Sequence, residues 1–216
     1  MSLSDALGIG RGEKVCVIGC GGKTALIAGL ARECAGEGVL IAPTTRIARR
    51  QMLHGPGIAY LGREMDDKLC AAPLEQIEAA SRDWALTLME ADGSRMLPLK
   101  GWAEGEPVIP AFATMVVGVF SVAALGLRAT TAHVHRLPLF LEITGLREGD
   151  TVDAAALARM ILAGMERCPG PRRAVLLNQA EDEWGMRAAQ EIAARLGGFE
   201  GAMLLGSAQR GEARRV

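Results

Sequence analysis

The sequence predicts an α/β fold in three layers, with a mostly parallel central sheet between helices. Two observations support this prediction. Short apolar runs bounded by Gly, Pro or acidic residues alternate with Ala- and Leu-rich segments of helical spacing. Each run suits a strand of a parallel sheet that is buried on both faces. At 216 residues the chain is long enough for one core, so we expect a single domain over residues 1–216.

Each element follows from its local pattern. The predicted strands are Lys14–Gly19, Val39–Pro43, Ile58–Leu61, Trp84–Ala91, Met115–Phe120, Ala174–Asn178 and Ala202–Leu205. The predicted helices are Thr24–Ala35, Leu74–Ser81, Ala154–Arg167 and Trp184–Leu196. Asp153 is a candidate N-cap, and Gly197-Gly198 is a helix stop. The Pro- and Gly-rich stretch Gly93–Pro110 predicts a long loop, and loops of that length in compact domains are usually functional.

Composition limits the function classes. Net charge is −1 with both signs mixed along the chain, which gives no electrostatic basis for binding nucleic acid or a membrane. No uncharged apolar run approaches the roughly 18 residues of a membrane span, and the N-terminus lacks a signal-peptide pattern, so we expect a cytoplasmic protein. The five cysteines lack paired C-x-x-C spacing and are interpreted as reduced thiols, although loop N–H groups are able to lower the thiol pKa of Cys20.

A glycine-rich turn carries the main functional prediction. Gly19-Cys20-Gly21-Gly22-Lys23-Thr24 follows a strand and opens a helix, which is the context of a phosphate-binding P-loop and predicts a P-loop-NTPase-like fold. Gly19 to Gly22 would wrap a phosphate, Lys23 would neutralise it, and the Thr24 hydroxyl would hold Mg²⁺. Val17 stands where the usual first glycine falls, so the loop is shortened and resembles that of Mur-type ligases and folylpolyglutamate synthases. The alternative is a purely structural turn.

A dinucleotide-binding Rossmann site fails two checks. Its third glycine would fall at Thr24, and the second predicted strand ends in Ala42-Pro43 rather than in an acidic residue for the ribose.

Two carboxylates and a Thr-Thr-Arg segment follow neighbouring strands. Glu90 and Asp92 are predicted as catalytic and metal-binding residues, one holding Mg²⁺ and the other orienting an attacking group. Alternatively, they merely end a strand before a turn. Thr45 is a second candidate for the metal and Arg46 for a charge clamp on the γ-phosphate, although Thr44 or Thr45 is equally suited to an N-cap.

Candidate nucleoside and substrate contacts lie further along the chain. Asn178, after a late strand, resembles the first residue of the Asn-Lys-x-Asp element that binds guanine, but Gln179 replaces the lysine and leaves the choice between ATP and GTP open. Arg95 and Lys100 suit an anionic substrate, and His135 and Arg136 are further substrate candidates. A polar strand end without a base, and ordinary loop histidines, are the alternatives.

Several segments along the chain together carry a family resemblance. They are the glycine loop, Thr44-Thr45, Glu90-Ala91-Asp92-Gly93-Ser94-Arg95, Leu97-Pro98-Leu99-Lys100, Glu106-Pro107-Val108-Ile109-Pro110 and His135-Arg136. In these segments, and most specifically from Glu90 through Pro110, the chain resembles the YqeC family of accessory proteins for selenium-dependent molybdenum hydroxylases. Met96, Gly101-Trp102 and Gln179 depart from the family pattern. The resemblance implies a role in hydroxylase maturation, with the hydroxylase or its cofactor as partner.

Two functions from different classes follow. The first is an enzyme that binds Mg²⁺ with ATP or GTP and transfers or hydrolyses the γ-phosphoryl group, with a substrate held by Gly93–Pro110. The second is a nucleotide-dependent switch or chaperone that binds a hydroxylase client and turns over slowly. Burial of Gly93–Pro110 against the phosphate loop favours the enzyme, and an exposed apolar surface there favours the switch. A scaffold that has lost activity is the minimal alternative.

Overall fold

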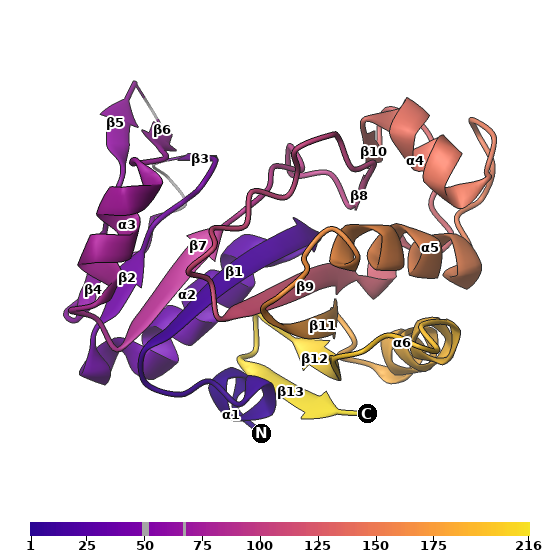
Figure 1. Cartoon of the computed structure of the whole chain (residues 1–216). Coiled ribbons are helices and arrows are strands. Elements are labelled where there is room, and N and C mark those ends of the chain that lie inside the picture. The colour runs from indigo at the N-terminus through magenta and orange to yellow at the C-terminus, as the bar shows by residue number, and fades with distance from the viewer. Residues whose placement is uncertain (49–51, 67) are drawn as a thin grey trace.

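The computed structural model describes residues 1–48, 52–66 and 68–216. Within them, eight strands form one sheet in the order β13-β12-β11-β9-β1-β7-β2-β4 (Figure 1). Every neighbouring pair is parallel except β12 and β13. The strands are β1 (Glu13–Cys20), β2 (Val39–Ile41), β4 (Ile58–Tyr60), β7 (Leu86–Glu90), β9 (Met115–Ser121), β11 (Arg172–Asn178), β12 (Ala202–Ser207) and β13 (Glu212–Arg215). The predicted mostly parallel sheet is confirmed.

Helices cover both faces of this sheet. The helices are α1 (Leu3–Leu7), α2 (Lys23–Cys34), α3 (Leu74–Ser81), α4 (Leu137–Thr144), α5 (Ala154–Met165) and α6 (Glu183–Arg195), with short 3-10 turns η1 (Ala35–Glu37) and η3 (Val122–Ala124). Two separate cores form because neighbouring residues of a strand point to opposite faces. Val15 and Val17 pack with α1 and α2, whereas Cys16 and Ile18 pack with α3 to α6. The three-layer arrangement follows.

Several short elements differ from the sequence prediction. The missed elements are α1, α4, β13, β3 (Arg46–Ala48), β5 (Arg63–Met65), β6 (Lys68–Cys70), β8 (Leu99–Lys100) and β10 (Val134–His135). β3, β6 and β5 form an antiparallel sheet, and β8 pairs in parallel with β10 inside the stretch predicted as a loop. Strands of two or three residues are too short to show a periodicity. These small sheets stand at two ends of the upper rim in Figure 1.

Caps and edges complete the fold. Asp153 caps α5 as predicted, since its Oδ1 accepts a hydrogen bond from the Ala156 N–H at 2.7 Å.

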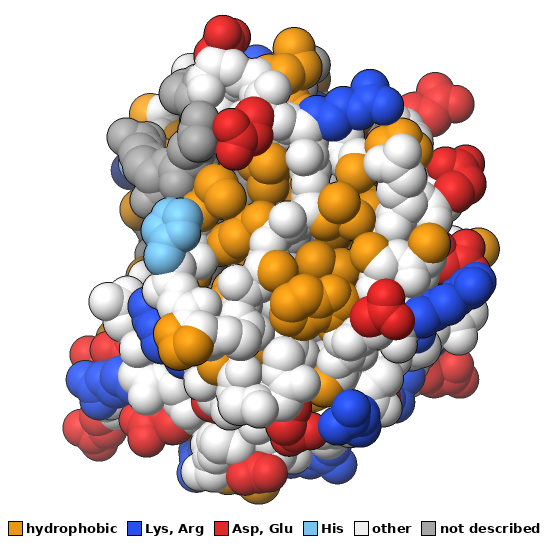
Figure 2. Space-filling model, turned by 90° about the vertical axis from the view of Figure 1, so that its left-hand side faces the viewer, with side chains coloured by type: hydrophobic (Ala, Val, Ile, Leu, Met, Phe, Trp, Pro, Cys, Tyr) orange, Lys and Arg blue, Asp and Glu red, His pale blue; other side chains and the backbone are white. Residues whose placement is uncertain are grey.

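Strand β4 forms one edge of the sheet, and Figure 2 shows apolar side chains gathered on that face of the molecule. The partly exposed apolar residues near this edge include Leu53, Ile58, Tyr60 and Leu61. Among the described residues, no helix is both long and apolar enough to cross a membrane.

The central strand should be sensitive to lost volume. Ile18 of β1 is 0% exposed, so we expect Ile18→Ala to lower the free energy of unfolding by about 2–5 kcal/mol, and Ile18→Val by about 0.5–1.5 kcal/mol. Urea denaturation measures both. Equal effects of the two substitutions would contradict close packing at this position.

Candidate functional site

The glycine loop lies at the carboxyl end of β1, between β7 and β9. Gly19, Gly21 and Gly22 have φ values of 101°, 90° and 140°, which side chains rarely adopt. A Cβ on Gly21 would lie 2.4 Å from the Cβ of Ser121, and one on Gly22 would lie 2.1 Å from the Asn178 Nδ2. Glycine is therefore required here both by backbone conformation and by contact with the ends of β9 and β11.

Asn178 braces this loop. Its Nδ2 donates to the Gly21 carbonyl at 2.9 Å, and its Oδ1 accepts from the Ala208 N–H at 2.8 Å. The side chain is 3% exposed. Next to it, the Ser121 hydroxyl donates to the Gln179 side chain. Asn178, the predicted nucleoside contact, therefore uses both its amide nitrogen and its amide oxygen in hydrogen bonds to the protein backbone.

Lys23 begins helix α2 and is buried. Its Nζ donates to the Gly19 carbonyl at 2.7 Å and lies 3.2 Å from the Asp92 Oδ1 and 3.9 Å from the Glu90 Oε1. Burial alone lowers the pKa of Lys23, but the negative charges of Asp92 and Glu90 outweigh it and raise the pKa. The ammonium group therefore stays charged at the base of the loop.

Asp92 lies beneath the loop and is 0% exposed. Its Oδ2 accepts from the Gly19 N–H at 2.9 Å and from the Lys100 Nζ at 2.7 Å. Its Oδ1 has no hydrogen bond of good geometry and faces Lys23. Because the carboxylate is enclosed by these cations and the backbone, it positions the loop. The geometry does not favour the metal-ligand role predicted for Asp92.

Glu90 is the carboxylate that borders open space. It lines a hollow of about 570 Å³ above the glycine loop. It also lines a pocket of about 20 Å³ beside Ile27, Ile41 and Leu53. Burial raises the pKa of Glu90, Lys23 lowers it, and Asp92 raises it, with a net upward shift. The hollow is lined by Gly21, Gly22, Lys23, Thr24, Ala25, Lys68, Glu90, Gly93, Ser94, Arg95 and Met96.

The Thr-Thr-Arg segment contacts the backbone. The hydroxyls of Thr44 and Thr45 donate to the Glu90 carbonyl at 3.3 and 3.4 Å, and Thr44 also donates to the Val108 carbonyl at 3.1 Å. Thr45 therefore contacts the chain that carries Glu90. Arg46 begins β3, and its side chain lies outside what the structure describes.

Of the four residues predicted to contact a substrate, Arg95 borders the hollow, whereas Lys100 is buried. Arg95 is exposed and lines the hollow. Lys100 is 0% exposed; its Nζ donates to the Gly93 carbonyl at 2.9 Å, lies 4.3 Å from the Trp102 ring centroid, and is 3.6 Å from the Glu106 Oε2. Because Lys100 is buried, the structure does not favour a direct contact between this residue and a substrate.

Arg136 and His135 flank this buried lysine. Arg136 pairs with both Glu106 carboxylate oxygens, at 2.5 and 2.7 Å. Burial and the nearby positive charges of Arg136, Lys100 and Arg95 lower the pKa of His135. These side chains therefore support the Gly93–Pro110 segment from the side of β10.

Gly93–Pro110 is largely packed against the site. The Val108 N–H donates to the Ala91 carbonyl at 3.0 Å, and the Trp102 Nε1 donates to the Met160 carbonyl at 2.9 Å. Trp102 is 2% exposed. Since Gly93 to Met96 also line the hollow beside the glycine loop, the arrangement favours the enzyme hypothesis over an exposed client surface at this segment.

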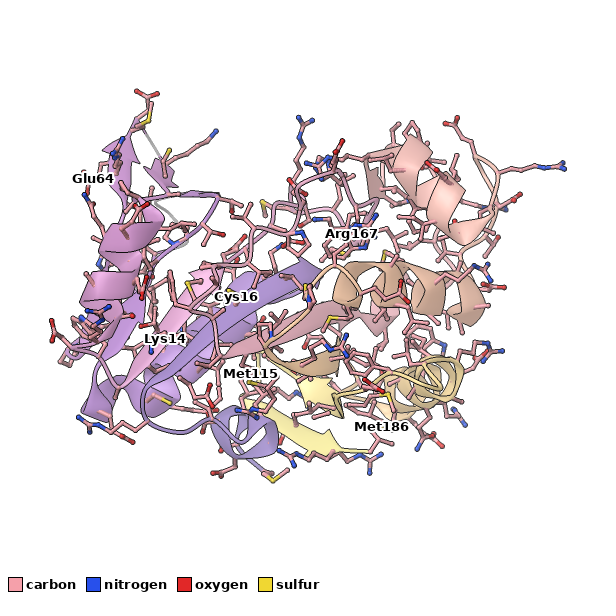
Figure 3. All side chains as sticks on the ribbon, viewed as in Figure 1. Lys14, Cys16, Glu64, Met115, Arg167 and Met186 are labelled. Carbon is pink, nitrogen blue, oxygen red and sulfur yellow. The ribbon has the colours of Figure 1, made fainter. Side chains whose placement is uncertain are left out.

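Three of the five cysteines are core residues. Cys16 lies in the middle of the sheet (Figure 3), and Cys16, Cys20 and Cys168 are buried. Burial raises the pKa of Cys20 to about 12, although Lys23 lowers it. The idea that loop N–H groups make Cys20 a reactive thiol is therefore wrong. No group of three or more potential His, Cys, Asp or Glu metal ligands occurs among the described residues.

Fold and site together define an α/β protein with a glycine-rich strand-to-helix loop over a buried carboxylate–lysine cluster. The chain belongs to the YqeC family, since the family described as "YqeC protein" matches residues 15–138. The "Uncharacterized protein YqeC" of Escherichia coli (strain K12) is 31% identical over 197 residues, which cover 78% of this chain and 77% of that relative. No solved structure matches the chain. The family resemblance noted from the sequence is confirmed.

Thiol labelling tests the burial of Cys20. At neutral pH, iodoacetamide should label the partly exposed Cys34 and Cys70 first, because only the thiolate reacts and the pKa of Cys20 is about 12. Mass spectrometry of peptides from the folded and urea-unfolded protein measures each site. Rapid labelling of Cys20 in the folded protein would refute its burial.

The Glu106–Arg136 pair predicts a pH-dependent stability. Burial by itself raises the pKa of Glu106, but the Arg136 hydrogen bonds and the Lys100 charge lower it below its ordinary 4.5. The pair therefore stabilises the fold above pH 4.5 and loses this effect as the pH falls through the lower folded pKa. We expect Glu106→Gln to cost about 1.5–3 kcal/mol at neutral pH.

This difference from the native chain should shrink in acid, as followed by urea denaturation at several pH values. Glu104→Gln, at an exposed position of the same segment, is the matched control and should have little effect at any pH. A cost of Glu106→Gln that does not change with pH would argue against the ion pair.

Proposed function

We propose that the chain binds Mg²⁺ with ATP or GTP at Gly19–Thr24 and transfers or hydrolyses the γ-phosphoryl group. The observation that carries the proposal is the position of the glycine loop and Lys23 at the carboxyl end of β1. Here β2 and β7 lie on one side of β1, and β9 and β11 on the other. In open parallel sheets, ligands bind at the carboxyl ends where the strand order reverses in this way.

The loop has the features that a phosphate requires. Gly22 is the N-cap residue of the twelve-residue helix α2 and, as a glycine, provides no side chain to cap the helix start. The first N–H groups of α2 are therefore available to an anion, and the helix dipole favours negative charge there. The glycine conformations keep side chains away from the approach to this backbone.

Each residue has a role in this proposal. Lys23 would neutralise the phosphates, and the Thr24 hydroxyl with Glu90 would hold Mg²⁺, whose preferred ligands are oxygens. Asp92 would act as a positioning residue, because it holds the Gly19 N–H and Lys23 from below. Bound nucleotide would supply the phosphoryl group. An oxygen of the acceptor or of water would form the new bond to phosphorus, while the bond from phosphorus to the bridging oxygen breaks and the nucleoside diphosphate leaves. The proton of the attacking oxygen would pass to solvent.

The biological role follows from the family resemblance. We include in the proposal an accessory step in the maturation of a selenium-dependent molybdenum hydroxylase, with the nucleotide-dependent reaction as the contribution of this site. The chemistry relies on positioning and charge stabilisation, which are the main sources of catalysis in phosphoryl transfer.

Nucleotide binding by the purified protein tests the proposal. At a hundredfold excess over Kd, Mg²⁺ with the preferred nucleotide should raise the free energy of unfolding by roughly 2.7 kcal/mol, and Lys23→Ala should abolish this gain. Thermal shift and calorimetry with ATP and GTP, with and without Mg²⁺, measure both. Lys14→Ala, at the opposite end of β1, is the control. No stabilisation by either nucleotide would overturn the proposal.

A further inference from the structure

The hollow above the glycine loop extends beyond Lys23. Its volume of about 570 Å³ falls within the roughly 300–1,000 Å³ typical of small-molecule sites. The outer wall includes Lys68 from β6 and Arg95 from the turn after β7. Lys68 was not singled out in the sequence, because it lies in a three-residue strand without a motif. The fold brings it beside residues of the phosphate loop.

Among the residues that the structure describes, some of the positive charges that line the hollow are paired with carboxylates and others are not. Lys23 is balanced by Asp92 and Glu90 at 3.2 and 3.9 Å. Within the described ranges, neither Lys68 nor Arg95 has a carboxylate at ion-pair distance. The outer part of the hollow therefore carries an excess of positive charge, which suits an anion.

The turn that carries Arg95 is strained and held in place. Arg95 and Met96 have φ values of 50° and 63°, and such consecutive left-handed residues are costly unless the surroundings enforce them. The buried Lys100 Nζ holds the Gly93 carbonyl at 2.9 Å, and the Leu97 N–H donates to the Ser94 carbonyl at 2.9 Å. The backbone strain thus presents Arg95 to the hollow from a fixed turn.

The two sides of the glycine loop are used differently. Asn178 and Ser121 close the loop on the side of β9 and β11. The hollow opens on the other side of β1, toward Glu90 of β7. A phosphate bound at the glycine loop and Lys23 would leave the part of the hollow lined by Lys68 and Arg95 free for a second molecule.

We propose that the outer hollow binds the acceptor of the phosphoryl group through an anionic substituent, a carboxylate or a phosphate, held by Lys68 and Arg95. This inference rests on the proposed function. It gives that function a substrate class, a small anionic acceptor, and assigns Lys68 and Arg95 to the acceptor and not to the nucleotide.

The experiment separates the two ligands. The protein is saturated with Mg²⁺ and the non-hydrolysable β,γ-imido analogue of its preferred nucleotide, and succinate or glycerol 3-phosphate is then titrated at millimolar concentrations by calorimetry or NMR. We expect one of the two probes to bind, which identifies the anion as carboxylate or phosphate. The double variant Lys68→Ala/Arg95→Ala should weaken that probe at least about tenfold, with nucleotide affinity changed less than about threefold.

The matched control is Lys14→Ala/Arg187→Ala, which removes the same charges from positions outside the hollow. It should leave binding of the probe unchanged. The inference is overturned if neither probe binds, if both double variants act alike, or if Lys68→Ala/Arg95→Ala weakens only the nucleotide. The same titration on the native protein and on Lys68→Ala/Arg95→Ala, without nucleotide, keeps the tests distinct. Probe binding that depends on Lys68 and Arg95 would persist there even if the protein bound no nucleotide.

Discussion

The buried carboxylate of Asp92 is the interaction on which the site depends. It accepts the Gly19 N–H at the start of the loop, faces Lys23 at the start of α2, and pairs with Lys100 from the segment that follows. A charged group without partners at a fully buried position is very costly, so these contacts are what make the burial of Asp92 tolerable. One side chain thereby fixes β1, α2 and β8 relative to one another.

Charge compensation continues outward from this point. Lys100 reaches Glu106, and Glu106 forms a two-oxygen pair with Arg136, so cations and carboxylates alternate from the loop to the base of α4. Bidentate guanidinium–carboxylate pairs are geometrically specific. The alternation explains why Lys23, Asp92 and Lys100 are tolerated at buried positions. It also leaves Glu90, Lys68 and Arg95 to face the hollow.

The sequence predicts correctly the elements that need a run of several apolar residues and the turn that needs glycine. Short, mainly apolar runs located the seven parallel strands that the described residues form in the main sheet, because strands of a parallel sheet contain few polar residues. The glycines between strand and helix indicated the loop, since no other residue fits its conformation and contacts. Strand β13 was missed because it is a polar edge strand in which only Ala213 is buried.

The sequence by itself therefore determined the layered sheet, the location of the loop and the residue types around it. Only the tertiary structure decided how the charged residues divide their roles. Glu90 and Asp92 are two positions apart and look equivalent in sequence, yet one borders the hollow and the other is enclosed by Lys23 and Lys100. The physical reason is that a charged group takes its role from the partners and burial supplied by distant segments, and local periodicity carries no record of them.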